Sequence, residues 1–165
     1  MNNSKEALEA ARQARELAGT VRHERDVIRA EWLLGWALID QTLAEAEPRL
    51  TEALTRCRLI NLVEYEPDIL LAWARWHRAA GHLKEDRECV DDALAIADRC
   101  EYRLVQADAH NLLARLYLDA GDRTEARRHA EIAKQRAWCD GPPHCCKPAL
   151  DEAEQLQNKA AAAEA

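Results

Sequence analysis

Apolar residues recur at intervals of three and four along nearly the whole chain, which is the spacing of one face of an α-helix. In the first segment, alanine and leucine follow this spacing from Lys5 to Ala18, with Ser4 placed as a cap and Gly19-Thr20 as an end. Comparable stripes predict about eight helices, with approximate bounds 5–18, 22–40, 47–60, 66–80, 83–99, 104–120, 123–138 and 148–160.

Proline and glycine mark the expected helix ends. Pro48 and Pro67 each follow a glutamate, and we expect both in the first turn of a helix, where proline is tolerated. Gly81 and Gly121 stand where tight reversals are needed. The segment 140–143, Asp-Gly-Pro-Pro, ends the regular pattern before a last helix.

The stretch 61–140 matches itself at an offset of 40 residues. Nine positions are identical at this offset: Asp68/Asp108, Ala74/Ala114, Arg75/Arg115, Ala80/Ala120, Gly81/Gly121, Glu85/Glu125, Arg87/Arg127, Ala93/Ala133 and Ala97/Ala137. A fixed period of this length is typical of stacked helical hairpins.

The period predicts the organisation of all 165 residues. We expect a single repeat array made of a half-repeat at 4–19, hairpins at about 22–60, 61–100 and 101–140, and a terminal helix at 148–162. Stacking the hairpins with a small constant rotation predicts an all-α, right-handed solenoid. A closed four-helix bundle is the alternative, but it needs heptad stripes and no long-range period.

The small residues of the hairpins resemble the tetratricopeptide repeat. In one copy Ala74, Gly81, Val90 and Ala93 match its pattern, and in the next Ala114, Tyr117, Gly121, Ala126, Ala130 and Ala133 match it. There are two departures. The spacing is 40 rather than about 34 residues, and Asp86 stands where a small residue is usual, which predicts looser packing at that point.

The longer repeat resembles the arrays at the C-terminal end of bacterial signal-transducing NTPases of the NACHT type. Residues 93–100 and 137–143 carry this resemblance. It implies that the chain is the sensor or partner-docking part of a larger bacterial signalling protein.

Composition narrows the classes of function. The net charge of −7 argues against a nucleic-acid-binding protein, which normally presents a basic face. No apolar run is long enough to span a membrane, and the N-terminus lacks the plan of a signal peptide, so we expect a cytoplasmic protein without a membrane partner. The six cysteines are then expected as reduced thiols. No catalytic motif or cofactor-binding motif occurs, so we expect neither an enzyme nor a bound cofactor.

The tetratricopeptide resemblance implies a groove lined by the first helix of each hairpin. The corresponding positions are Asp68, Leu71, Arg75, Arg78, Asp108, Asn111, Arg115 and Leu118. Among them Arg75, Arg78, Asn111 and Arg115 form a candidate peptide-binding clamp, because arginine holds carboxylates through paired hydrogen bonds and asparagine can hold an extended backbone. The alternative is that these are ordinary solvated charges of helix surfaces.

Two other groups of residues have simple structural interpretations. The tryptophans at 32, 36, 73, 76 and 138 are expected as bulky core residues in a chain without phenylalanine, although Trp36 or Trp76 could instead anchor a partner. Cys139, His144, Cys145 and Cys146 lie close together, but their spacing is poor for zinc, and we expect a compact cap without a metal.

These observations favour a non-catalytic scaffold that binds a protein or peptide partner, and the arginines of the clamp would suit an acidic or carboxylate-bearing one. The alternative is a structural spacer or a homo-oligomerisation module without a ligand of its own. It would associate through the apolar face that an array beginning in mid-repeat leaves uncovered.

Overall fold

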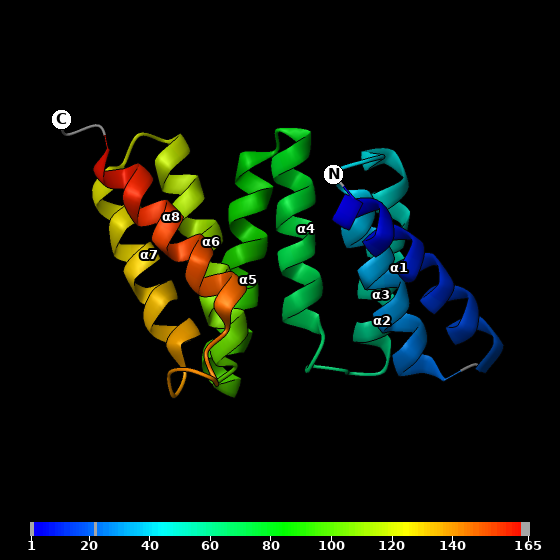
Figure 1. Ribbon diagram of the computed structural model, residues 1–165. Helices are drawn as coiled ribbons and strands as arrows, with labels where there is room; N and C mark the ends of the chain where they lie inside the picture. Colours follow the sequence, from blue (N-terminus) through cyan, green and yellow to red (C-terminus); the bar gives the residue numbers. More distant parts are fainter. Residues whose placement is uncertain (1, 22, 163–165) are drawn as a thin grey trace. The chain divides into compact units, whose positions relative to one another are not determined.

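The computed structural model describes residues 2–21 and 23–162, and every regular element in these ranges is an α-helix (Figure 1). The helices are α1 (Asn2–Val21), α2 (Glu24–Leu38), α3 (Leu43–Leu59), α4 (Glu66–Ala80), α5 (Leu83–Cys100), α6 (Arg103–Asp119), α7 (Arg123–Trp138) and α8 (Lys147–Ala161). The all-helical class and the eight expected helices are therefore confirmed.

Three expected helix boundaries are wrong. Helix α1 begins at Asn2, so that Ser4 lies inside it and is not its cap. Helix α1 continues through Gly19 to Val21, because a glycine inside a helix costs only about 1 kcal/mol. Helix α3 begins at Leu43, so that Pro48 lies inside it rather than in its first turn. The proline removes the hydrogen bond to the carbonyl of Ala44, and this exposed residue can bond to water instead.

Left-handed backbone conformations recur every 20 residues, at Asn61 (φ 52°), Gly81 (φ 82°), Glu101 (φ 56°), Gly121 (φ 81°) and Gly141 (φ 78°). At the first four positions, the N–H of the next residue donates to the carbonyl five residues before it. His82 to His77 at 2.8 Å is one such bond. This closure satisfies carbonyls that the helix end leaves without partners. The 40-residue period of the sequence is thus a 20-residue period of helix-ending turns.

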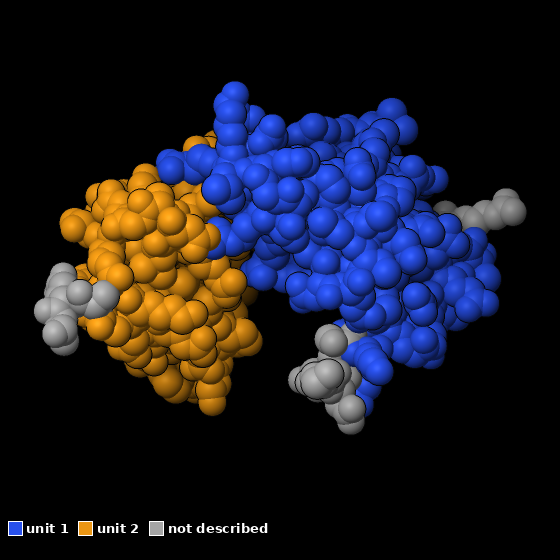
Figure 2. Space-filling model, turned by 90° about the horizontal axis from the view of Figure 1, so that it is seen from above, with its two compact units in different colours: residues 1–89 blue, residues 90–165 orange. Residues whose placement is uncertain are grey.

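The chain divides into two compact units, residues 1–89 and 90–165, and helix α5 belongs to both (Figure 2). In unit 1, α2 packs against α1 and α3, and α4 packs against α3 and α2. Ile28, Leu50 and Ile69 are fully buried there. A Cβ atom at Gly35 would lie 2.7 Å from Cδ2 of Leu50, so the glycine allows α2 and α3 to approach closely.

The tryptophans of unit 1 surround this core. Trp32 and Trp73 pack against buried residues of α2, α3 and α4. Trp76 packs beside buried leucines of α2 and donates its indole N–H to the carbonyl oxygen of Leu43 at 2.9 Å. All three side chains are only partly buried. Trp138 in unit 2 is 48% exposed, so the prediction of a core residue is wrong at that position.

A buried carboxylate joins three helices of unit 1. The side chain of Glu31 on α2 is only 4% exposed and accepts from Arg15 of α1 at 2.9 Å and from Arg49 of α3 at 3.2 Å. Removing a carboxylate from water is costly unless ion pairs and hydrogen bonds compensate it. The two arginines supply this compensation, and the packing of α1, α2 and α3 is therefore fixed in register.

Unit 2 contains α6, α7 and α8 packed against one another, which Figure 1 shows at its yellow-to-red end. Alanines form much of the contact. Buried apolar side chains on α7 and α8 are Ala126, Ala130, Ala133, Ala137, Ala149, Ala153, Leu156 and Ala160. Small side chains allow neighbouring helix axes to approach closely, and the loss of one methyl-sized contact is then felt directly.

None of the helices in residues 2–21 and 23–162 combines the length and the apolar character needed to cross a bilayer.

The left-handed turns lead to a first prediction. Gly81→Ala and Gly121→Ala should each lower the free energy of unfolding by about 1 kcal/mol or more, because a Cβ atom is disfavoured at these φ values. Glu101→Gly should raise it by about 0.5–1 kcal/mol for the same reason. Urea denaturation followed by circular dichroism measures each change.

Gly19→Ala is the matched control, because Gly19 lies within α1 and a Cβ atom there meets nothing within 4 Å. This substitution should stabilise the protein by up to about 1 kcal/mol through helix propensity. Equal effects at positions 19 and 121 would contradict the assignment of the turns.

Candidate functional site

The four residues of the predicted peptide clamp lie on two helices, one in each unit. Arg75 and Arg78 are on α4 of unit 1, and Asn111 and Arg115 are on α6 of unit 2. Each pair is therefore described within its own unit. Their role in peptide binding stays a prediction.

In unit 1 both arginines make intramolecular contacts. The guanidinium carbon of Arg75 lies 4.5 Å from the ring centroid of Trp36, which is a cation–π distance. Nη1 of Arg78 lies 3.6 Å from a carboxylate oxygen of Asp86. Asp86 is fully buried, at the position where the repeat pattern leads one to expect a small residue. The expectation of loose packing is therefore wrong there: the carboxylate is enclosed and faces an arginine.

In unit 2 the predicted residues contact α8. Asn111 is buried, and its side-chain N–H donates to the carbonyl oxygen of Ala149 at 2.9 Å. Nη2 of Arg115 lies 2.9 Å from a carboxylate oxygen of Glu152. The Arg115 side chain is still 41% exposed, although its Nε atom is buried. The side-chain N–H of Asn111 is thus bonded to α8, whereas the Arg115 side chain remains partly exposed.

A partly buried histidine pair in unit 2 was not foreseen from the sequence. Nδ1 of His110 on α6 lies 2.9 Å from Nδ1 of His129 on α7, and the ring of His129 also stacks on Tyr117 at 5.2 Å. The sequence did contain a signal for this pair. The two histidines lie on the two arms of one predicted hairpin, His110 before the turn at Gly121 and His129 after it, at similar distances along the chain.

Hydrogen bonding assigns the protons of this pair. Nη2 of Arg128 lies 3.0 Å from Nε2 of His129, and because arginine only donates, this nitrogen must accept. His129 then carries its proton on Nδ1 and donates it to Nδ1 of His110. Both rings are neutral in this arrangement. Burial and the neighbouring His129 lower the pKa of His110 to about 4.

An aromatic cluster on α4 lies in unit 1. The rings of Trp73 and Trp76 meet edge to face at 5.3 Å, and the ring of His77 lies 5.1–5.4 Å from both. The His77 pKa is lowered, chiefly by burial and then by His82. The indole N–H of Trp73 is buried without a hydrogen-bond partner. Trp73 and Trp76 of this cluster also pack against the buried core of unit 1, which gives the cluster a structural role.

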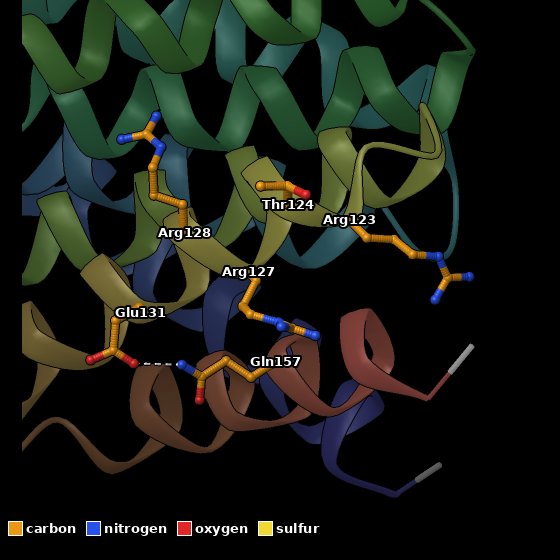
Figure 3. Close-up of a pocket in the computed structure, with 6 residues that line it drawn as sticks. All are labelled: Arg123, Thr124, Arg127, Arg128, Glu131 and Gln157. Atoms are coloured by element: carbon orange, nitrogen blue, oxygen red, sulfur yellow. Dashed lines mark hydrogen bonds between the residues drawn. The ribbon is translucent and has the colours of Figure 1, made fainter. Parts of the chain in front are cut away.

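A shallow cleft of about 410 Å³ lies between α7 and α8 and is lined by arginine (Figure 3). Arg123, Arg127 and Arg128 belong to it, but their guanidinium groups point in different directions. Arg128 pairs with Glu125 at 2.8 Å, and Gln157 donates to Glu131 at 2.7 Å across the cleft. The arginines therefore do not converge on one point, as a built anion site requires.

The cysteines act as individual thiols. All six are free, and Cys57 is buried. Burial raises the pKa of the Cys57 thiol to about 11, and its Sγ donates to the carbonyl oxygen of Leu62 at 3.1 Å. No group of three or more histidine, cysteine or acidic side chains within residues 2–21 and 23–162 is arranged to hold a metal ion.

Comparison with known protein families finds no matching family, and no curated protein matches the chain at a significant level.

The Arg78–Asp86 pair leads to a second prediction. Arg78→Met leaves a buried carboxylate without this cation and should lower the free energy of unfolding by about 3 kcal/mol. Adding Asp86→Ala to this variant should recover most of the loss, because alanine fits the equivalent buried positions, Ala46 and Ala126. Thermal and urea denaturation of the two variants test this. A loss below about 0.5 kcal/mol in the single variant would show that the ion pair contributes little to stability.

The histidine pair leads to a third prediction. An unfolded histidine takes up a proton near pH 6.5, whereas His110 in the folded protein does so only near pH 4. Between these values the unfolded state binds more protons, so the free energy of unfolding should fall as the pH falls. We expect His110 to contribute about 1–2 kcal/mol of this fall between pH 7 and pH 5.

His110→Asn is the matched variant, because it keeps an acceptor for His129 and does not titrate. Urea denaturation at pH 5, 6, 7 and 8 should give a shallower dependence for the variant than for the unmodified protein. Identical pH dependence in both proteins would contradict the burial of a neutral His110.

Proposed function

We propose that this chain is a non-catalytic scaffold, a right-handed solenoid of tetratricopeptide-like hairpins that docks a protein or peptide partner. The observation that carries the proposal is the recurrence of left-handed turns at 20-residue intervals, four of them with the same hydrogen-bonded closure. Regular turns give arms of similar length, and arms of similar length are what stacked hairpins require. Stacked hairpins present an extended surface, which is the usual binding surface of such arrays.

The resemblance to arrays of bacterial signalling NTPases supports a narrower proposal. The chain would be the sensor or partner-docking part of a larger signalling protein. In that setting the array recognises a partner, and a separate segment performs the response.

Arg75 in unit 1 and Arg115 in unit 2 are each the residue of their own unit that is best placed to contact a partner. Arg75 is held against the ring of Trp36, which reduces the number of conformations that its side chain loses on binding. Arg115 is oriented by Glu152 and remains partly exposed. Guanidinium groups that are already oriented suit carboxylates of an acidic peptide, through paired hydrogen bonds. Arg78 and Asn111 already contact a buried carboxylate and a backbone carbonyl within the chain, so the first test does not use them.

A fourth prediction tests these two arginines with acidic peptides. A set of fluorescent peptides with a free C-terminal carboxylate, and the same set amidated, is titrated with the protein by anisotropy. We expect binding of members of the free-acid set, and a Kd at least about tenfold weaker for the Arg75→Ala/Arg115→Ala variant. Helix content measured by circular dichroism should be unchanged.

Arg99→Ala is the matched control, because Arg99 is an exposed arginine on α5, outside the first helices of the hairpins. It should bind as the unmodified protein does. Binding that is equally weakened by Arg99→Ala would indicate attraction by overall charge. Binding that survives the double substitution would contradict the assignment of the surface.

A further inference from the structure

Helix α1 repeats a residue pattern that other helices of the chain bury completely. Small or apolar residues occupy positions with spacings of four, three and four in α1, α3 and α7. The three sets are Ala7, Ala11, Ala14 and Ala18; Ala46, Leu50, Ala53 and Cys57; and Ala126, Ala130, Ala133 and Ala137. Every member of the last two sets is buried by neighbouring helices.

In α1 this stripe is only half covered. Ala11 and Ala18 are buried at 7% and 6% exposure, but Ala7 and Ala14 are exposed. Next to them Leu17 is 65% exposed. Within the described residues α1 packs against α2, and one flank of its apolar surface remains uncovered.

A cleft lies along the uncovered flank of α1. A cleft of about 430 Å³ lies between α1 and α2 and has apolar walls. Its lining residues are Ala14, Leu17, Ala18, Asp26, Arg29, Ala30 and Leu33. Leu33 is itself 38% exposed. A cleft of small residues with leucines at its edges fits an α-helix, because small side chains allow close approach and leucines fill the remaining space.

We propose that this cleft is an interface between two copies of the chain, in which the α1 helices pair antiparallel about a two-fold axis. The exposed apolar residues of α1 are Ala7, Ala10, Ala14 and Leu17. Their spacing of three, four and three is symmetric about position 12. An antiparallel second copy therefore sets Ala7 against Leu17 of its neighbour and Ala10 against Ala14. A two-fold interface requires such self-complementarity, in which each residue of a pair meets the other.

Charge supports a second copy as the occupant. Over the whole sequence the net charge is −7, so most surfaces of two copies repel each other. Helix α1 is neutral, because its basic and acidic side chains are equal in number: Lys5, Arg12, Arg15, Glu6, Glu9 and Glu16. The two charged residues of the cleft, Asp26 and Arg29, also cancel. Two copies can thus meet at this face without net repulsion.

The other end of the chain does not fit the cleft as well. The buried residues of α8 already pack within unit 2. Its outward face carries exposed polar side chains, which are Asp151, Glu154, Gln155, Asn158 and Lys159. A polar face of this kind resembles a solvent-facing cap. Head-to-tail association of α8 with α1 would bury these charges, and the two-fold pairing avoids that cost.

Sedimentation equilibrium over a concentration series tests the proposal on the 165-residue chain. We expect a reversible dimer with a Kd in the range of about 1–100 μM, as suits a small apolar interface. Leu17→Glu and Leu33→Glu should each weaken the dimer at least about tenfold, because each places a charge in the interface. Both leucines are exposed in one copy, so helix content should not change.

Leu59→Glu is the matched control, because Leu59 is 81% exposed and lies at the end of α3, away from the cleft. It should leave the Kd unchanged. A protein that stays monomeric at every concentration would overturn the proposal, and so would a dimer that tolerates both Leu17→Glu and Leu33→Glu.

Mixing two single variants tests the antiparallel register. Ala10→Lys and Ala14→Glu should each weaken the homodimer. In a mixture, the new ammonium group at position 10 faces the new carboxylate at position 14 of the other chain, so the heterodimer should form in preference to either homodimer. Native mass spectrometry counts the species. Homodimers and heterodimers in statistical proportion would overturn the proposed register. None of these results depends on whether acidic peptides bind, so the two proposals succeed or fail separately.

Discussion

Close approach of helices along stripes of small side chains is the constraint on which this structure depends. In α7 the stripe is alanine at every buried position of the pattern, and in α3 the equivalent positions are Ala46, Leu50, Ala53 and Cys57. Each contact contributes little apolar area, so stability must come from many short contacts rather than from a few large side chains. Gly35 extends the same principle, because even a methyl group there would meet Leu50. The tryptophans surround these contacts and do not replace them.

A stripe of alanines does not by itself fix the register of two packed helices, because small smooth surfaces can slide past each other. Buried polar groups remove this freedom. Glu31 fixes α1, α2 and α3 through two arginines, and Asn111 fixes α8 to α6 through one backbone carbonyl. The His110–His129 contact does the same for α6 and α7. Each of these hydrogen bonds or ion pairs forms in one register only, so that a displaced helix would leave another buried polar atom without its partner.

Local signals in the sequence predicted the helices well, because periodicity, glycine and proline act over a few residues. The bounds of α4 and α7 follow directly from Pro67, Gly81 and Gly121. The left-handed turns at Asn61 and Glu101 escaped detection, since neither residue is glycine. Asparagine adopts this conformation more readily than most residues, whereas glutamate gives no such local signal. Pro48 led to a wrong prediction of where α3 begins. A proline can be accommodated inside a helix where the carbonyl that loses its partner is exposed and bonds to water.

Side-chain partners were the least predictable feature. Arg75 and Arg78 share a face of α4 by their spacing, and Asn111 and Arg115 share a face of α6. Spacing does not reveal that Asp86, Glu152 or a backbone carbonyl contacts three of them. The same holds for the histidine pair. Its members lie on different helices, and only the closure of the hairpin brings them together.

Within each unit the helices pack mainly on those that precede or follow them in the chain, and this arrangement governs how the protein folds and opens. Contacts between residues near in sequence form with little loss of loop entropy, which favours rapid folding. The same locality limits cooperativity, because a terminal helix can detach while the rest of its unit stays intact. In unit 2, α8 packs on α6 and α7, so the opening of α8 would leave the contact between α6 and α7 in place. Amide hydrogens in such a molecule exchange along a gradient, fastest at the ends and slowest in the middle of each unit.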